Sequence, residues 1–128
     1  MRGLSAISAA SLSELNRRLP AGSGPLSMDR FRPNLVLHGA EPFEEDDWET
    51  IRIGEVTFHV VKPCERCKIT MTDQKTGVVD GKAEPLRSLA KFRLVDGRRL
   101  FGQNLVHEAD GTVSVGEQVH VLKYRGRP

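Results

Sequence analysis

The chain has 128 residues, of which 38% are hydrophobic and 28% charged, a length and balance typical of one globular domain. Its formal net charge of +2 offers no strongly basic surface for nucleic acid, and its apolar runs are shorter than the roughly 18 residues that a membrane span needs. Two cysteines do not make the disulfide framework of a small secreted protein, so we expect a cytoplasmic protein with no nucleic-acid and no membrane partner.

The N-terminal region predicts one helix. Residues 1–10 are expected to be disordered or a remnant strand. Ser11 and Glu14 then have capping-box spacing, in which Ser11 accepts from the backbone N–H of Glu14 and the Glu14 carboxylate reaches back. Apolar residues recur on one helix face after this box and Pro20 stops the helix, so we predict a helix over 11–19.

Two arginines precede a short apolar run at 35–37 that predicts a strand. Arg30 and Arg32 are two positions apart, and on an extended segment they would point to the same side, which suits an anion. The alternative, which composition alone favours, is a solvated pair of cations flanking a buried Phe31.

Six acidic residues lie between Glu41 and Glu49. Clustered carboxylates bind calcium in some proteins, but this spacing is not that of an EF-hand loop and it lacks the central glycine. We therefore predict a solvated loop or short helix, anchored to the core by Trp48.

Two segments resemble β-hairpins. Apolar residues alternate on both sides of Gly54-Glu55 over residues 51–60, and a glycine at the first turn position fits a type II′ turn. Residues 113–121 have the same form around Gly116-Glu117, although the apolar phase after the turn differs by one position. We interpret this as shared turn chemistry and not as a duplication.

The remaining segments complete the predicted domain. They are a strand at 69–72, a loop at 73–82, a helix beginning at 84–90 with Pro85 in its first turn, a turn at Asp96-Gly97 and a strand at 101–106. The fold class predicted for the single domain 1–128 is mainly β with two short helices (α+β), with a β-rich core over 30–124 that forms a curled sheet or barrel.

Both cysteines lie within Lys62-Pro63-Cys64-Glu65-Arg66-Cys67-Lys68. Neighbouring cations favour the thiolate, which is the form that acts as nucleophile or metal ligand. A thioredoxin-like redox pair would place the motif at a helix N-terminus, whereas this motif runs into a strand-like segment. A structural zinc site needs four ligands, and the four histidines are scattered singly. Two buried cysteines without chemistry are the third interpretation, and the flanking charges argue against deep burial of both.

Five motifs in order resemble the MOSC domain, the C-terminal domain of molybdenum-cofactor sulfurases. The similarity runs from about Ser11 over nearly the whole chain and is strongest to the branch that contains the bacterial YcbX-type proteins and the mitochondrial amidoxime-reducing component. The motifs are Arg30-Phe31-Arg32-Pro33-Asn34, Lys62-Pro63-Cys64-Glu65-Arg66-Cys67, Glu84-Pro85-Leu86, Phe101-Gly102-Gln103-Asn104-Leu105 and Val115-Gly116-Glu117.

The resemblance implies a MOSC-type β-barrel that binds the molybdenum cofactor, molybdopterin with its metal. Cys67 matches the position whose thiolate ligates molybdenum and is the implied catalytic residue, with Arg66 beside it as part of the cofactor site. Arg32 and Asn34 match positions that contact the pterin, and a guanidinium suits its phosphate. Glu65 stands where relatives often carry a small hydroxyl residue. The implied activity is reduction of N-hydroxylated small molecules, with an electron-donor protein as partner, or cofactor-linked sulfur transfer.

Full-length relatives of this branch carry a further N-terminal region that supplies part of the cofactor pocket. The chain is therefore expected to need a partner for that part, or to be a fragment of a longer protein. Two alternatives remain open: a non-catalytic truncated barrel that serves as an interaction module, and a thiol redox protein that uses Cys64 and Cys67.

Overall fold

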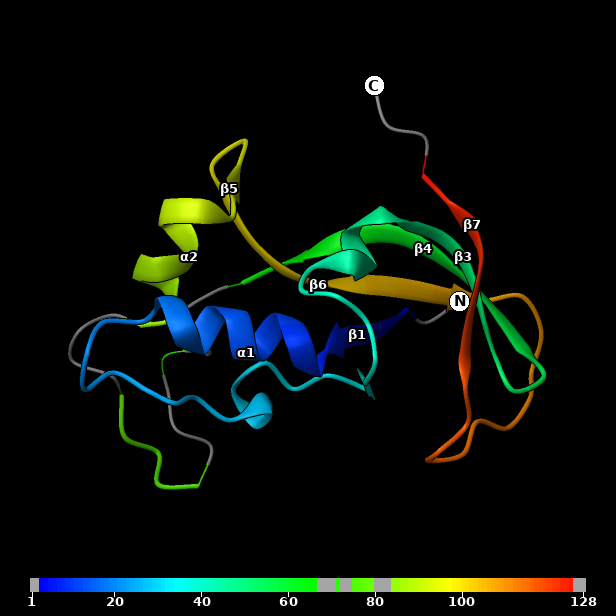
Figure 1. The fold of residues 1–128 in the computed structure, drawn as a ribbon, viewed down its shortest axis with the longest axis horizontal. Helices are drawn as coiled ribbons and strands as arrows, with labels where there is room; N and C mark the ends of the chain where they lie inside the picture. Colours follow the sequence, from blue (N-terminus) through cyan, green and yellow to red (C-terminus); the bar gives the residue numbers. More distant parts are fainter. Residues whose placement is uncertain (1–2, 67–70, 72–74, 80–83, 126–128) are drawn as a thin grey trace.

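The strands form one mixed sheet that curls into a half-barrel (Figure 1). The computed structural model describes residues 3–66, 71, 75–79 and 84–125. The order across the sheet is β2-β1-β6-β4-β3-β7, and β5 pairs with β6 off this path. The strands are β1 Leu4–Ser8, β2 Leu35–Leu37, β3 Trp48–Ile53, β4 Val56–Glu65, β5 Leu94–Val95, β6 Arg98–His107 and β7 Val119–Tyr124.

Only the β1–β2 pair is parallel among the described pairs, and the others are antiparallel. Two α-helices, α1 Ala9–Arg18 and α2 Leu86–Phe92, lie at one end of the sheet, and two short 3-10 helices, η1 Met28–Arg30 and η2 Glu44–Asp47, connect the elements (Figure 1). The fold class predicted from sequence, mainly β with two short helices, is confirmed.

Hydrophobic side chains form two clusters, as alternating burial along the strands requires. One fills the concave side of the sheet and includes Ile51, Phe58 and Leu105. The other lies between the helices and the sheet, where Phe31 and Phe101 stack with ring centroids 4.5 Å apart. This second cluster supports the loop that precedes β2 and therefore the predicted site.

Residues 4–8 form β1, a strand inside the sheet, so of the two expectations for this segment the strand is the one observed. β1 pairs with both β2 and β6, and the Ile7 side chain is fully buried. The helix begins at Ala9 and not at Ser11, because Ser8 ends β1 in an extended conformation and caps the helix by accepting from the Ser11 backbone N–H at 3.0 Å. Glu14 bonds to Arg17 and Arg18 instead of completing a capping box.

The structure also corrects two other predictions. Arg30 closes a 3-10 turn and Arg32 has a φ of 49°, so the two arginines are not on an extended segment. The second predicted hairpin has the Ser114–Glu117 turn, but only its second arm is a strand, β7, and this strand pairs with β3. In the expected first arm, Val113 packs only partly against the core and Val115 is fully exposed, so little burial favours a strand there.

The other predicted elements are confirmed or fall outside the described residues. The hairpin around Gly54 is formed, with Ile53 opposite Val56. The helix after Pro85 and the Asp96-Gly97 turn are also present, the turn with positive φ at both positions, as a type I′ turn requires. The predicted strand at 69–72 lies outside the described residues apart from Met71.

Candidate functional site

Arg66 fixes the end of β4 to two distant parts of the chain. Its backbone N–H donates to the Arg99 carbonyl at 2.8 Å, its Nε donates to the Phe101 carbonyl at 2.8 Å, and its Nη1 donates to the Phe31 carbonyl at 3.0 Å. The guanidinium also lies 5.3 Å from the centre of the Phe31 ring. Arg66 therefore holds the Arg32 loop against the strand that leads to Cys67.

Gly102 leaves the space that this arrangement needs. Its φ is 88°, and a Cβ at this position would lie 2.8 Å from the Ile7 side chain and 3.1 Å from Nη2 of Arg66. Any larger residue would displace Arg66 or separate β6 from β1. This explains the glycine in the Phe101–Leu105 motif by packing alone.

Asn34 ties the same loop to β1. Its Oδ1 accepts from the Ser5 backbone N–H at 2.8 Å, and its own N–H donates to the Ser5 carbonyl at 3.0 Å. The carbonyl oxygen of the side chain is thus committed to the protein backbone. What Asn34 retains for a ligand is its exposed position and its amide nitrogen.

Two arginines at this end have side-chain nitrogens without a bonded partner among the described residues. Arg32 is exposed, and within that part of the chain no hydrogen bond or ion pair engages its guanidinium. The Nε of Arg99 is buried and has no hydrogen-bond partner. A buried unpaired donor is costly, so it indicates a group that an anionic ligand would satisfy. The sequence analysis missed Arg99, and the Arg98-Arg99 pair before the Phe101 motif was its only signal.

The two cysteines are not equivalent. Cys64 is 7% exposed, and burial raises the pKa of its thiol despite the opposing charges of Arg66 and Lys62. Cys64 is thus buried despite the flanking charges, because its strand directs it inward. The expectation that the two cysteines are not both deeply buried stays a prediction. Glu65, next along the strand, is exposed. Cys67 lies outside the described residues, so its role as metal ligand stays a prediction.

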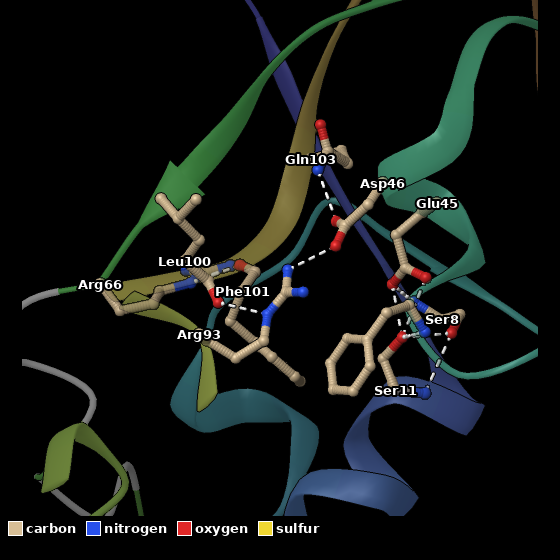
Figure 2. Close-up of polar contacts among 10 residues, drawn as sticks. Ser8, Ser11, Glu45, Asp46, Arg66, Arg93, Leu100, Phe101 and Gln103 are labelled. Atoms are coloured by element: carbon tan, nitrogen blue, oxygen red, sulfur yellow. Dashed lines mark hydrogen bonds and ion pairs between the residues drawn. The ribbon is translucent and has the colours of Figure 1, made fainter. Parts of the chain in front are cut away.

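Acidic residues of η2 form hydrogen bonds and an ion pair with neighbouring elements of the fold (Figure 2). The Glu45 carboxylate is 1% exposed and accepts from the Ser8 backbone N–H at 2.9 Å and from the Ser11 hydroxyl at 2.8 and 2.9 Å. Asp46 accepts from Gln103 at 2.7 Å and pairs with Arg93 at 2.6 Å. The predicted short helix and the anchoring of Trp48 are confirmed. The expectation of a solvated cluster is wrong for Glu45, which is buried by its bonds to Ser8 and Ser11.

No group of three or more histidine, cysteine or acidic side chains that could hold a metal ion occurs among the described residues. In the same part, no helix has the length and hydropathy that a membrane crossing requires.

Comparison with known proteins identifies the domain. The family model of the MOSC domain matches residues 1–120. The chain belongs to the MOSC domain family. It is 40% identical over 125 residues to the molybdenum cofactor sulfurase of Arabidopsis thaliana. The matched region covers 89% of this chain and 15% of that protein.

Two further relatives are mitochondrial proteins. The chain is 41% identical over 122 residues to the mitochondrial amidoxime reducing component 2 of Rattus norvegicus, covering 89% of this chain and 35% of that protein. It is 39% identical over 124 residues to the mitochondrial amidoxime-reducing component 1 of Homo sapiens, and the matched region covers 91% of this chain and 36% of that protein. The chain thus spans between about a seventh and about a third of the length of these relatives.

Proposed function

We propose that this MOSC domain binds the molybdenum cofactor at the end of β4, with the Cys67 thiolate as metal ligand. Arg32 and Arg99 would hold the pterin phosphate, Asn34 would offer its amide nitrogen to the ring system, and Arg66 would position the loop that carries Arg32. The observation that carries the proposal is that Arg66 joins residues 31–34 to the chain immediately before Cys67.

The donor set supports an anionic cofactor. The exposed guanidinium of Arg32 and the buried unpaired Nε of Arg99 both suit phosphate oxygens, which accept several hydrogen bonds from planar arginine groups. Two residues predicted to contact the cofactor, Arg66 and Asn34, have side-chain atoms that already bond within the protein. The Nε and Nη1 of Arg66 and the Oδ1 of Asn34 bond to backbone groups, so these residues mainly shape the site.

When bound, the cofactor supplies two-electron redox chemistry. Reduction of an N-hydroxylated compound takes two electrons and two protons, breaks the N–O bond, and yields an N–H group and water. The electrons would come from a donor protein. Sulfur transfer linked to the cofactor is the alternative that the name of the plant relative favours.

Metal and pterin analysis tests the proposal directly. The chain is produced in cells that synthesise the cofactor, and its molybdenum and pterin contents are compared with those of Cys67→Ser and Cys64→Ser. We expect molybdenum in the parent chain, a loss of at least about 10-fold in Cys67→Ser, and retention in Cys64→Ser, because only Cys67 is the proposed ligand. Absence of both metal and pterin, or unchanged molybdenum in Cys67→Ser, contradicts the ligand assignment.

The same measurement distinguishes a second candidate function. The bonds of Arg66 and Asn34 to backbone carbonyl and amide groups stabilise the domain without any ligand. This observation favours an interaction module that retains the half-barrel but does not bind the cofactor. A folded parent chain without molybdenum and without pterin would support this second function.

A further inference from the structure

A pocket lies on the half-barrel near the residue at which β4 begins. Its volume is about 400 Å³, and its lining includes Leu4, Leu35, Val56, Phe58 and His107. Val56 begins β4 and Arg66 follows its end, and a strand of ten residues is roughly 30 Å long. The part of the pocket formed by β4 therefore lies far from Arg66, whereas Leu35 directly follows Asn34 of the proposed cofactor site.

The floor and walls of this pocket are apolar. Phe58 and Val56 are 2% and 5% exposed and belong to the main core of the sheet, and Leu4 and Leu35 pack against that core from the two neighbouring strands β1 and β2. A concave apolar site at the mouth of a curled sheet is a common location for a small organic ligand, and the volume lies within the usual range for such sites.

The loop after β6 is fixed over the pocket. The Glu108 backbone N–H donates to the Thr57 carbonyl at 2.9 Å, and the Glu108 carboxylate lies 2.8 Å from Nε2 of His59. A Cβ at Gly111 would lie 2.6 Å from Cγ2 of Val56, so the loop approaches the core as closely as glycine permits. The pocket is thus formed before any ligand binds, which lowers the entropic cost of binding.

His107 gives the pocket a specific polar group. Its Nδ1 lies 3.2 Å from the Ala109 carbonyl, which can only accept a hydrogen bond, so in the neutral ring this contact assigns the proton to Nδ1. Nε2 is then an acceptor. The pocket combines apolar walls with two side-chain acceptors, Nε2 of His107 and the carboxylate of Asp110. This combination favours a compact ligand that carries a hydroxyl or amine donor and no negative charge.

We propose that this pocket, formed by Leu4, Leu35, Val56, Phe58, His107 and the Gly111 loop, binds a small aromatic or aliphatic molecule with one hydrogen-bond donor to His107. The site is independent of the molybdenum cofactor. Charged acids are disfavoured, because the acceptor of His107 and the carboxylate of Asp110 on the rim both repel an anion.

The test is a titration of the full chain with 2-naphthol, 2-methoxynaphthalene and 2-naphthoate, followed by NMR of the leucine and valine methyl groups. We expect saturable shifts, with half-saturation below about 1 mM for 2-naphthol, at the methyl groups of Leu4, Leu35 and Val56. Binding of 2-methoxynaphthalene, which lacks the donor, should be roughly 10-fold weaker, as expected for the loss of one hydrogen bond. His107→Phe should abolish this difference.

Two neighbouring substitutions on β2 provide a matched pair. Leu35→Phe adds bulk inside the pocket, whereas Val36→Phe adds the same ring at the next residue, which is 44% exposed. We expect Leu35→Phe to weaken 2-naphthol binding at least 10-fold and Val36→Phe to leave it unchanged. If Leu35→Phe does not fold, the His107→Phe comparison still decides.

Several results would overturn the proposal: no saturable shift up to 2 mM (about twice the upper limit expected from the ligand size), shifts centred on other methyl groups, or equal binding by the naphthol and its methyl ether. Pocket shifts that depend on protein concentration without probe would also overturn it, since they would identify a second copy as the occupant. Binding should be the same in Cys67→Ser, so failure of the cofactor proposal and failure of this one are distinguishable.

Discussion

The pKa of a thiol depends on its burial as well as on the charges near it. Lys62 and Arg66 both favour the thiolate of Cys64, yet burial raises the pKa of that thiol because the low-dielectric core disfavours the charged form. The strand places Cys64 inward and leaves Glu65 exposed, so adjacent residues of one motif have opposite environments. Cys64 is therefore a small buried residue whose thiolate form is disfavoured.

This environment predicts slow alkylation of Cys64. In Cys67→Ser, which leaves a single thiol, we expect iodoacetamide to modify the native protein at pH 7.5 at least about 10-fold more slowly than the same variant in 8 M urea, because the raised pKa and the burial both reduce accessible thiolate (rates set by the thiolate fraction). Mass spectrometry gives both rates. A native rate equal to or above the rate in urea would contradict the burial argument and restore a reactive role for Cys64.

Among the secondary-structure elements, the sequence predicted best those that depend on a short local segment such as a turn or a helix start. The Gly54 hairpin, the Asp96-Gly97 turn and the helix after Pro85 follow from backbone preferences of a few residues. The place of the N-terminal strand inside the sheet and the burial of Glu45 in η2 were not predicted, because both depend on distant partners. Glu45, for example, is buried only because Ser8 and Ser11 supply its hydrogen bonds.

The sequence predicted which residues belong to the candidate site, but not the hydrogen bonds that these residues make. The family resemblance implied that Arg32, Asn34 and Arg66 share one site, and in the structure Arg66 bonds to the Phe31 carbonyl next to Arg32. The sequence carried no sign that the Arg66 and Asn34 side chains bond to backbone groups, because those carbonyl and amide partners lie 29 to 35 positions away. Arg99 was missed for the same reason.

The turn between β3 and β4 provides a prediction at this scale. Gly54 has a φ of 58°, and a Cβ there would lie 1.7 Å from Oε2 of Glu117, whose Oε1 accepts from the Ser114 N–H. Gly54→Ala should therefore combine backbone strain with a clash against the turn before β7, lowering the free energy of unfolding by about 2–3 kcal/mol.

Urea unfolding of a double-mutant cycle separates the two causes. In the Glu117→Ala background the clash is absent, so Gly54→Ala should cost only about 1 kcal/mol, the strain alone. Gly116→Ala is the matched control, since Gly116 also has positive φ but a Cβ there meets nothing within 4 Å. Equal costs of Gly54→Ala in both backgrounds would show that Glu117 does not pack against the first turn.

For the whole molecule, η2 is the junction that links the ends of the sheet. Glu45 bonds to β1 and α1, Asp46 to β6 and to Arg93 after α2, and Glu44 to Trp48 of β3 and Tyr124 of β7. Three consecutive carboxylates thus hold elements that are far apart in sequence. Of the three, Glu44 has a lowered pKa, so the stability of the domain should depend on pH through the contacts of Glu44.

Glu44 allows this dependence to be measured with its sign. The Glu41 backbone N–H, the Trp48 indole and the Tyr124 hydroxyl donate to Glu44 and lower the pKa of its carboxyl below the ordinary value of 4.5. Above pH 4.5 the carboxylate is ionised in both states and its contribution is complete. Below that pH the unfolded chain takes up the proton first, so the contribution declines as the pH falls through the folded-state pKa.

We therefore expect Glu44→Gln to be less stable than the parent chain by about 1 kcal/mol at pH 7. The value is low because Glu44 is only partly buried. The difference in stability should shrink steadily between pH 5 and pH 3. Urea unfolding at each pH gives the difference, and other titrating groups cancel because both chains share them. Tyr124→Phe is the matched comparison. It removes only the weakest of the three donors, at 3.3 Å, so most of the pH dependence relative to Glu44→Gln should remain. A difference that stays constant from pH 7 to pH 3 would mean that Glu44 does not link β7 to β3 as an ionised acceptor.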